Sequence, residues 1–148
     1  MAFKFSTGFR DSVLDTSAVK TLLENTGTIK IYSGTAPATA DAALGAAVLL
    51  VTITDNGLGG GLTFEAAAAS GSLQKLSSQV WKGTIASSGT ASFFRYVVAG
   101  DDGALSTTQV RVQGLVGLGG TDMNLSSVNL TATEEQTLDA FVIAFSTL

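Results

Sequence analysis

The order of apolar and polar residues divides the chain into a short helical part and a long part built of strands. From Thr7 to Asn25 the apolar residues recur at about every fourth position, which is typical of helices. The cap-forming residues 15–17 interrupt this pattern, and Ser17 is placed to cap a second helix. We therefore predict two short helices, of which the second ends at Asn25 and Gly27. The apolar residues that define them are Phe9, Val13, Leu14, Val19, Leu22 and Leu23.

From Thr28 onward the apolar residues alternate with period two, which predicts strands separated by turns. Many short strands with a single proline in the chain indicate an all-β fold, a β-sandwich of jelly-roll or immunoglobulin-like type with a short N-terminal helical segment. We expect one compact domain, with an arm and short helices at 1–27 and the sandwich at 28–148. Besides the first strand, the predicted strands are Val48–Thr54, Leu62–Glu65, Leu73–Leu76, Gln79–Ala86, Ala91–Ala99, Gln109–Gln113, Asn124–Thr131 and Gln136–Ser146.

Three of these strands carry a more detailed prediction. The turn residues Ser87–Thr90 predict a hairpin that pairs the strand of Trp81 with the strand of Phe94. Residues 140–145 are apolar on both faces of the last strand, which predicts a central or covered position.

Glycines gather in two segments, Gly57–Gly61 and Gly114–Gly120, and each contains the tetrapeptide Gly-Leu-Gly-Gly. Neither is followed by the Gly-Lys-Ser/Thr of a phosphate-binding loop, so that function is excluded. Two interpretations stay open: flexible loops between strands, or loops that become ordered against a neighbouring subunit. The glycines taken as interface candidates are Gly59, Gly60, Gly119 and Gly120.

Two groups of aromatic residues each allow two interpretations. Phe3, Phe5 and Phe9 crowd the N-terminus, where they either close over the domain's own core or form an arm that binds a neighbouring subunit. Tyr32 and Trp81 are either core residues or aromatic platforms for a sugar. A single tryptophan in a small β domain is more often a core residue.

The chain contains no histidine and no cysteine, which removes most catalytic and metal-binding arrangements. The acidic pairs Asp101-Asp102 and Glu134-Glu135 remain. Adjacent residues on a strand point to opposite faces, so neither pair suits glycoside hydrolysis, and both are interpreted as polar turns. Calcium at Asp101 and Asp102 is a weaker alternative. We expect no enzyme activity, no cofactor and no metal.

Charge is scarce: charged residues make up 14% of the chain, compared with about 25% in an ordinary domain. A net charge of −4 without any basic run argues against binding to nucleic acid. The longest apolar run, 42–53, is too short to span a membrane, and no signal peptide is recognised, so we expect synthesis in the cytoplasm. A surface of about 7,000 Å² would carry few charges, which suggests that partner chains cover part of it and that the protein is a homo-oligomer.

Several segments follow one another in a characteristic order. They are Phe5-Ser6-Thr7-Gly8-Phe9-Arg10, residues 29–37, residues 40–43, Leu62-Thr63-Phe64, residues 80–84, Gly89-Thr90-Ala91, Phe94-Arg95-Tyr96 and Asn124-Leu125-Ser126-Ser127. This order resembles a family of small virion proteins of tailed bacteriophages, and the resemblance covers most of the chain.

The resemblance implies a structural role in the virion, which assembles in the host cytoplasm, and implies no catalytic residues. We expect a head decoration or cement protein that contacts the major capsid protein or other virion proteins. A tail, neck or fibre-base component is the first alternative. A carbohydrate-binding module or a lytic glycosidase is a more distant one. The candidate interface residues are Phe3, Phe5, Phe9, Tyr32, Gly59, Gly60, Gly119 and Gly120.

Overall fold

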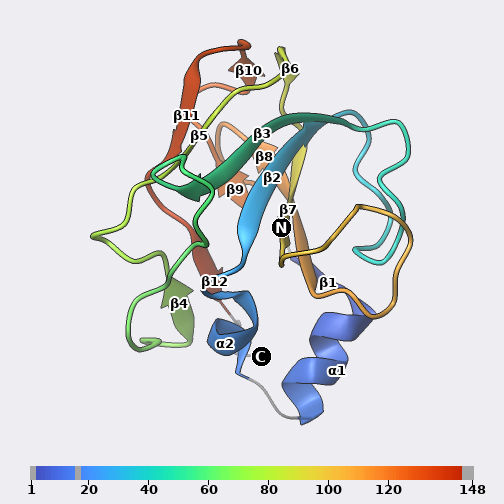
Figure 1. Cartoon of the computed structure of the whole chain (residues 1–148), viewed down its shortest axis with the longest axis vertical. Coiled ribbons are helices and arrows are strands. Elements are labelled where there is room, and N and C mark those ends of the chain that lie inside the picture. The colour runs from blue at the N-terminus through green and yellow to red at the C-terminus, as the bar shows by residue number, and fades with distance from the viewer. Residues whose placement is uncertain (1–2, 16–17, 145–148) are drawn as a thin grey trace.

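The computed structural model describes residues 3–15 and 18–144. Most of the regular secondary structure is β, arranged in a sandwich-like fold of antiparallel sheets with two short helices near the N-terminus (Figure 1). The fold class predicted from the sequence is therefore confirmed. The helices are α1 (Thr7–Asp15) and α2 (Val19–Leu23), and the strands are β1 (Lys4–Phe5), β2 (Thr28–Ser33), β3 (Val48–Asp55), β4 (Ser72–Gln74), β5 (Trp81–Thr84), β6 (Gly89–Thr90), β7 (Phe93–Val97), β8 (Arg111–Gly117), β9 (Met123–Asn124), β10 (Asn129–Leu130), β11 (Glu135–Leu138) and β12 (Val142–Ala144).

One large sheet dominates the fold. Its eight strands include seven in the order β1-β8-β7-β2-β3-β5-β11, and β9 pairs with β8 beside them. Two small sheets, β10–β6 and β12–β4, complete the structure. Among these strand pairs only β8–β9 is parallel. The N-terminal arm belongs to the large sheet, because Lys4 and Phe5 of β1 pair with Gln113 and Val112 of β8.

The inner face of the large sheet carries the hydrophobic core. Alternate residues of β7, Phe94 and Tyr96, point to this face and are fully buried. The ring of Phe141 lies 5.7 Å from that of Phe94 and 5.8 Å from that of Trp81. Phe64 packs against the Trp81 ring at 5.6 Å and so covers the same core from another segment. The expectation that Trp81 is a core residue is therefore confirmed, since none of its surface is exposed.

The outer face of the same sheet carries a row of polar side chains, of which Arg95 and Gln113 are buried, Lys30 is half-buried and Lys4 is exposed. Lys30, Arg95, Gln113 and Lys4 lie opposite one another on neighbouring strands and form a row across β2, β7, β8 and β1. Two long connections cover this face, residues 34–47 between β2 and β3 and residues 98–110 between β7 and β8 (Figure 1). The two connections are hydrogen-bonded to each other, from Leu44 N–H to the Gly103 carbonyl at 3.1 Å.

The helical part matches the prediction of two short helices. Ala18 occupies the N-cap position of α2 without a side-chain hydrogen bond, whereas the predicted cap Ser17 lies outside the described residues. Asn25 follows the helix with φ 67, as a residue that ends a helix often does. No helix within the described residues is long and apolar enough to cross a membrane.

The predicted hairpin at Ser87–Thr90 is wrong. β5, which contains Trp81, pairs with β3 and β11, while β7, which contains Phe94, pairs with β2 and β8. The residues between them instead form β6, whose partner is β10. The apolar alternation only requires that Trp81 and Phe94 face a common core, and they reach it from strands that are not neighbours.

The prediction for the last strand is also wrong. Residues 136–146 were expected to form one covered strand, but the chain leaves the large sheet after Leu138 and then pairs with β4 as β12. Phe141 and Ile143 are buried, whereas Val142 is 41% exposed, so only one face is covered. Residues 145–146 lie outside the described residues.

Three more predicted boundaries change. Residues 124–131 form two short strands instead of one, and residues 62–65 make a single bridge from Phe64 to Lys75. Strand β8 runs to Gly117, so the glycines at 114 and 117 belong to a strand and not to a loop. At Gly114 a side chain would collide with the ring of Phe94, which explains why a glycine sits inside a strand.

Candidate functional site

The most unusual feature of the structure is the connection of residues 34–47, which we name the long loop. It contains no helix or strand, although connections longer than about 12 residues without secondary structure are uncommon and usually functional or disordered. Three buried side chains of the outer sheet face hold it in place. They donate hydrogen bonds to its carbonyls, from Gln113 Nε2 to Pro37 at 2.7 Å, from Arg95 Nη2 to Ala42 at 2.7 Å and to Thr39 at 3.4 Å, and from Arg111 Nη1 to Ala40 at 3.2 Å and to Asp41 at 3.3 Å.

Arg111 forms a buried ion pair with Asp101. Its Nε lies 2.5 Å from Asp101 Oδ2 and its Nη2 lies 2.8 Å from Oδ1, a two-pronged contact in which neither side chain is more than 1% exposed. Burial alone would raise the pKa of Asp101, but the hydrogen bonds from Arg111 and from Gly103 N–H lower it below its ordinary value. Arg111 Nη2 also donates to the Ala104 carbonyl at 2.8 Å, so the pair fixes both connections.

Arg95 is a second buried cation on the same face. Its Nε donates to Gln113 Oε1 at 2.9 Å, and only 1% of the residue is exposed. Nη1 has no hydrogen-bond partner within the described part of the chain. Burial and the nearby charge of Arg111 lower the pKa of Arg95. The sheet therefore places two guanidinium groups beneath the loops, and the connection of residues 98–110 supplies one strongly held carboxylate.

The N-terminal arm is tied to the same assembly. Asp41 of the long loop accepts hydrogen bonds from Thr7 N–H at 2.8 Å and from the Thr7 hydroxyl at 2.7 Å, at the start of α1. Burial would raise the pKa of Asp41, but these hydrogen bonds lower it. The buried hydroxyl of Ser6 donates to the Gln109 carbonyl at 2.6 Å and accepts from Arg111 N–H at 3.0 Å. Arm, long loop and β8 thus form one hydrogen-bonded unit.

The two connections themselves add little charge to the outside of this unit, although Lys4 of the arm donates to the Ala38 carbonyl of the long loop at 3.0 Å. We define the loop face as the exposed residues of 34–48 and 103–110, a stretch in which Asp41 is the only ionisable residue. Its apolar side chains reach into solvent, with Leu105 at 74% and Val48 at 51% exposed. The loop face is therefore a fixed, sparsely charged, partly apolar surface, which is the kind of surface that a partner chain covers.

The predicted interface aromatics lie mostly inside the domain. Phe9 is 3% exposed and stacks on Phe5 with ring centres 4.7 Å apart. Phe3 packs edge-on against Phe94 at 6.3 Å. Tyr32 is 4% exposed and stacks on Phe93 at 5.1 Å. In this conformation, Phe9 and Tyr32 do not present their rings to a partner.

Neither aromatic that could stack on a sugar is accessible, because Trp81 and Tyr32 are both buried. By contrast, the four candidate glycines, Gly59, Gly60, Gly119 and Gly120, are all exposed. Their role at an interface stays a prediction. The leucines beside them are among the most exposed apolar residues described, Leu58 at 83% and Leu118 at 67%.

The acidic pairs do not form a reactive site. Asp101 is occupied by Arg111, and Asp102 accepts a hydrogen bond from Ala104 N–H at 3.0 Å. Both carboxylates that were considered as calcium ligands therefore already have hydrogen-bond partners within the protein. Glu135 pairs with Lys82 at 2.9 Å on the surface. In the ranges that the structure describes, no group of three acidic residues, histidines or cysteines could hold a metal ion.

Sequence reasoning missed the residues that build this unit, Arg95, Arg111, Gln113 and Asp41. A signal was present in β7, where Arg95 stands between aromatic and β-branched residues in a chain with few charges. A charged residue inside such a strand needs a buried partner.

Comparisons with protein-family models, curated proteins and solved structures found no match to this chain.

Proposed function

We propose that this chain is a structural protein of a tailed-bacteriophage particle, a head decoration or cement protein that binds the shell through its loop face. The proposal combines the resemblance of the sequence to small virion proteins with the character of the loop face. Among the residues whose burial is described, Arg95, Asp101 and Arg111 are buried, so these three of the twenty charged residues of the chain do not reach the surface.

The observation that carries the proposal is the fixed shape of the long loop. Ordering a residue costs about 1–2 kcal/mol of backbone entropy, so an irregular loop stays mobile unless other contacts hold it. Here Arg95, Arg111 and Gln113 hold it through carbonyl contacts inside the domain. A loop that is already ordered loses less entropy when a partner binds, which favours its use as a contact surface.

A decoration protein works through many equal contacts. Each copy needs to bury only about 800 Å² against a neighbour, because the symmetric shell repeats the contact many times. A protein that binds only the assembled shell stabilises that shell by mass action. No step of this function needs a catalytic residue or a cofactor.

Copy number in the particle tests the proposal. Purified particles of the phage that encodes the chain would be measured by quantitative mass spectrometry, normalised to the major shell protein. We expect a copy number comparable to that of the shell protein. A number in the tens or below would place the protein in the tail, neck or fibre base, and absence from particles would contradict a virion role.

A further inference from the structure

We propose that the pocket between the N-terminal arm and the long loop binds a carboxylate, which is supplied by an acidic side chain of the protein that covers the loop face. The inference rests on the proposed function, because it gives the chemistry of the partner at one place on the same surface. Arg10 and Lys4 bind the carboxylate, and the aliphatic stem of the acidic side chain packs against Phe5.

The pocket lies beside the loop face and is open to solvent. It is lined by Lys4 and Phe5 of β1, by Arg10 of α1 and by residues 38–41 of the long loop. Its volume is about 310 Å³, and engineered cavities of about 150 Å³ already hold benzene. A carboxylate on a short aliphatic stem is no bulkier than benzene, so the pocket can accept an acidic side chain. Phe5 and the alanines of the loop segment provide an apolar wall for the stem.

Two cations line the pocket, and neither forms an ion pair with a described residue. Lys4 Nζ donates to the Ala38 carbonyl at 3.0 Å, and Arg10 Nη2 donates to the Thr7 hydroxyl at 3.1 Å. Both cationic residues are exposed. A guanidinium has five N–H donors in a planar fork that matches a carboxylate. Arg10 therefore keeps donors for a ligand in the pocket.

The Thr7 hydroxyl connects Arg10 to Asp41, the one carboxylate among the residues that line the pocket. This hydroxyl accepts from Arg10 and donates to Asp41 Oδ2 at 2.7 Å, while Thr7 N–H donates to Oδ1 at 2.8 Å. Thr7 thus contacts both carboxylate oxygens, and it also holds Arg10 in position. One negative charge beside two positive ones leaves an excess positive charge. A singly charged carboxylate balances this excess, whereas a doubly charged phosphate would exceed it.

The backbone of the long loop adds a donor of its own. The Ala40 carbonyl accepts a hydrogen bond from the buried Arg111 at 3.2 Å. The N–H of Asp41 belongs to the same trans peptide and points the opposite way. Asp41 lines the pocket and Arg111 does not, and the Asp41 N–H has no hydrogen-bond partner in the described part of the chain. It lies on the side away from the buried cation, where a free backbone N–H favours an anion.

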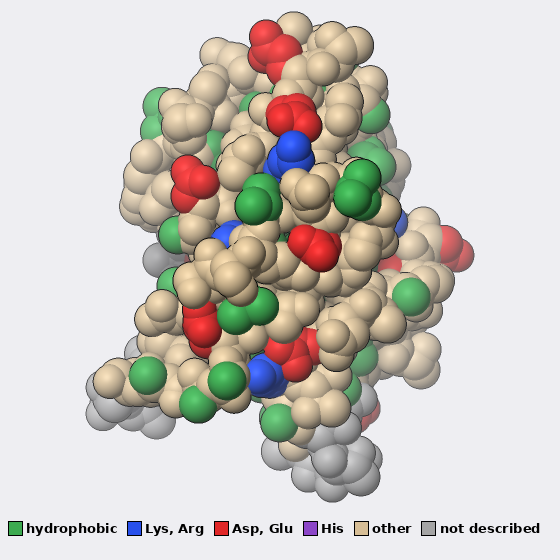
Figure 2. Space-filling view, turned by 60° about the vertical axis from the view of Figure 1, so that its left-hand side comes forward, with side chains coloured by type: hydrophobic (Ala, Val, Ile, Leu, Met, Phe, Trp, Pro, Cys, Tyr) green, Lys and Arg blue, Asp and Glu red, His purple; other side chains and the backbone are tan. Residues whose placement is uncertain are grey.

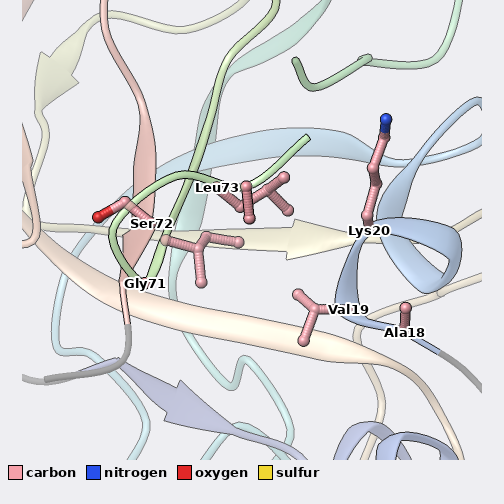
Figure 3. A pocket seen from close by; sticks show the side chains of 8 residues that line it. Ala18, Val19, Lys20, Gly71, Ser72 and Leu73 are labelled. Carbon is pink, nitrogen blue, oxygen red and sulfur yellow. The ribbon is translucent and has the colours of Figure 1, made fainter. Parts of the chain in front are cut away.

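The other surfaces of the molecule offer no comparable cations. The pocket beside α2 has a volume of about 250 Å³, with Lys20 at its wall (Figure 3). This lysine is already paired, because its Nζ lies 3.5 Å from Glu24 Oε1. The face seen in Figure 2 carries scattered acidic side chains with few basic ones between them. An acidic partner group is therefore best matched at the arm, and Lys20 provides a matched control.

The first test uses the full-length chain alone, and its probe is the capped amino acid N-acetylglutamate amide at constant ionic strength. Proton–nitrogen NMR follows the Nε–H of Arg10 and the N–H of Asp41 during the titration. We expect saturable shifts of both signals, and no such shifts with the uncharged N-acetylglutamine amide. Arg10→Met and Lys4→Met should each weaken binding of the charged probe, the first at least tenfold, whereas Lys20→Met should leave it unchanged. Thermal unfolding confirms that the variants are folded.

The second test measures binding of the chain to purified particles that lack it, by co-sedimentation. Arg10→Met should bind at least tenfold more weakly than the unchanged chain, and Lys20→Met should bind normally. A chain that binds the capped glutamate but no particle would contradict the proposed function and the source of the carboxylate, while the carboxylate site would stand.

Three results would overturn the carboxylate site itself. The first is a capped glutamate that produces no saturable shift, and the second is a capped glutamine that binds equally well. The third is an Arg10→Met variant that binds particles as tightly as the unchanged chain, which would leave the proposed function intact.

Discussion

At the scale of single residues, the Arg111–Asp101 pair illustrates how a buried charge organises its surroundings. Each group lies where water cannot solvate it, and each is satisfied by the other and by backbone groups of the two connections. Removing one partner leaves the other charge buried without compensation, which is more costly than the pair itself is favourable. Substituting only one residue of the pair should therefore lower the stability of the fold by more than the pair itself contributes.

We expect Arg111→Met to lower the free energy of unfolding by about 3–5 kcal/mol, because Asp101 would remain buried without its cation. Urea denaturation followed by tryptophan fluorescence measures the change. The exposed pair of Lys82 and Glu135 provides the control, and Lys82→Met should cost at most about 1 kcal/mol. Similar losses for the two variants would contradict the buried role of Arg111.

The two tyrosines of the chain make a second prediction at this scale. Burial raises the pKa of Tyr32 to about 12, and it also raises the pKa of Tyr96, whose hydroxyl donates to the Leu23 carbonyl at 3.0 Å. In the unfolded chain both hydroxyls titrate near a pH of about 10. Because the folded pKa values are higher, their contribution to stability is complete below that pH and is lost as pH rises through the folded pKa values.

Ultraviolet absorbance of tyrosinate tests this directly. In the folded protein neither tyrosine should ionise at a pH of about 10, whereas both should do so in denaturant. Stability should fall as the pH is raised from about 10 to about 12. A folded-state tyrosine that titrates at its ordinary pKa would show that the Tyr32–Phe93 stack, or the Tyr96 site, is open to solvent.

At the scale of elements, strand β8 shows why glycine can be required inside a strand. A Cβ at Gly114 would lie 2.7 Å from a ring carbon of Phe94 and 2.8 Å from Asp122 Cβ, well inside normal contact. At Gly119, in the following loop, a Cβ would meet no atom within 4 Å. Two glycines of the same segment therefore have opposite tolerance to a side chain.

We expect Gly114→Ala to destabilise the fold by about 1–3 kcal/mol, because the strand or the Phe94 ring must shift. Gly119→Ala should leave stability unchanged or raise it by up to about 1 kcal/mol, since alanine restricts the unfolded chain. Thermal unfolding of the two variants side by side makes the comparison. Equal effects at the two positions would mean that Phe94 moves freely to make room.

The strands also show how much of the fold could be predicted from the sequence. The sequence pattern located β2 and β3 almost to the residue, because both are runs of buried aliphatic residues bounded by turn residues. It did not identify strand partners, since Trp81 and Phe94 both face the core but lie on strands separated by β2 and β3. Pairing depends on contacts between distant segments, and the period of a strand contains no information about them.

At the scale of the whole molecule, a polar layer lies between the large sheet and the two long connections, and the sequence analysis did not predict it. The outer face of the large sheet carries Arg95, Arg111 and Gln113 under the long loop. From sequence alone the scarcity of charge pointed to a covered exterior, but it could not indicate which surface is involved. The loop face became visible only once the two connections were placed against each other, because neither has a periodic pattern of its own.

The sparsely charged loop face leads to the last prediction, which concerns binding to the particle. Leu105→Asp places a charge at a side chain of the loop face that is 74% exposed and that a partner would desolvate. We expect at least tenfold weaker binding to purified particles that lack the chain, measured by co-sedimentation, with thermal unfolding unchanged. Val142→Asp, on β12 outside the loop face, is the matched control and should bind normally. If the Val142 variant lost binding while the Leu105 variant kept it, the contact surface would lie on the side of β12 instead, and the order of the long loop would need another explanation.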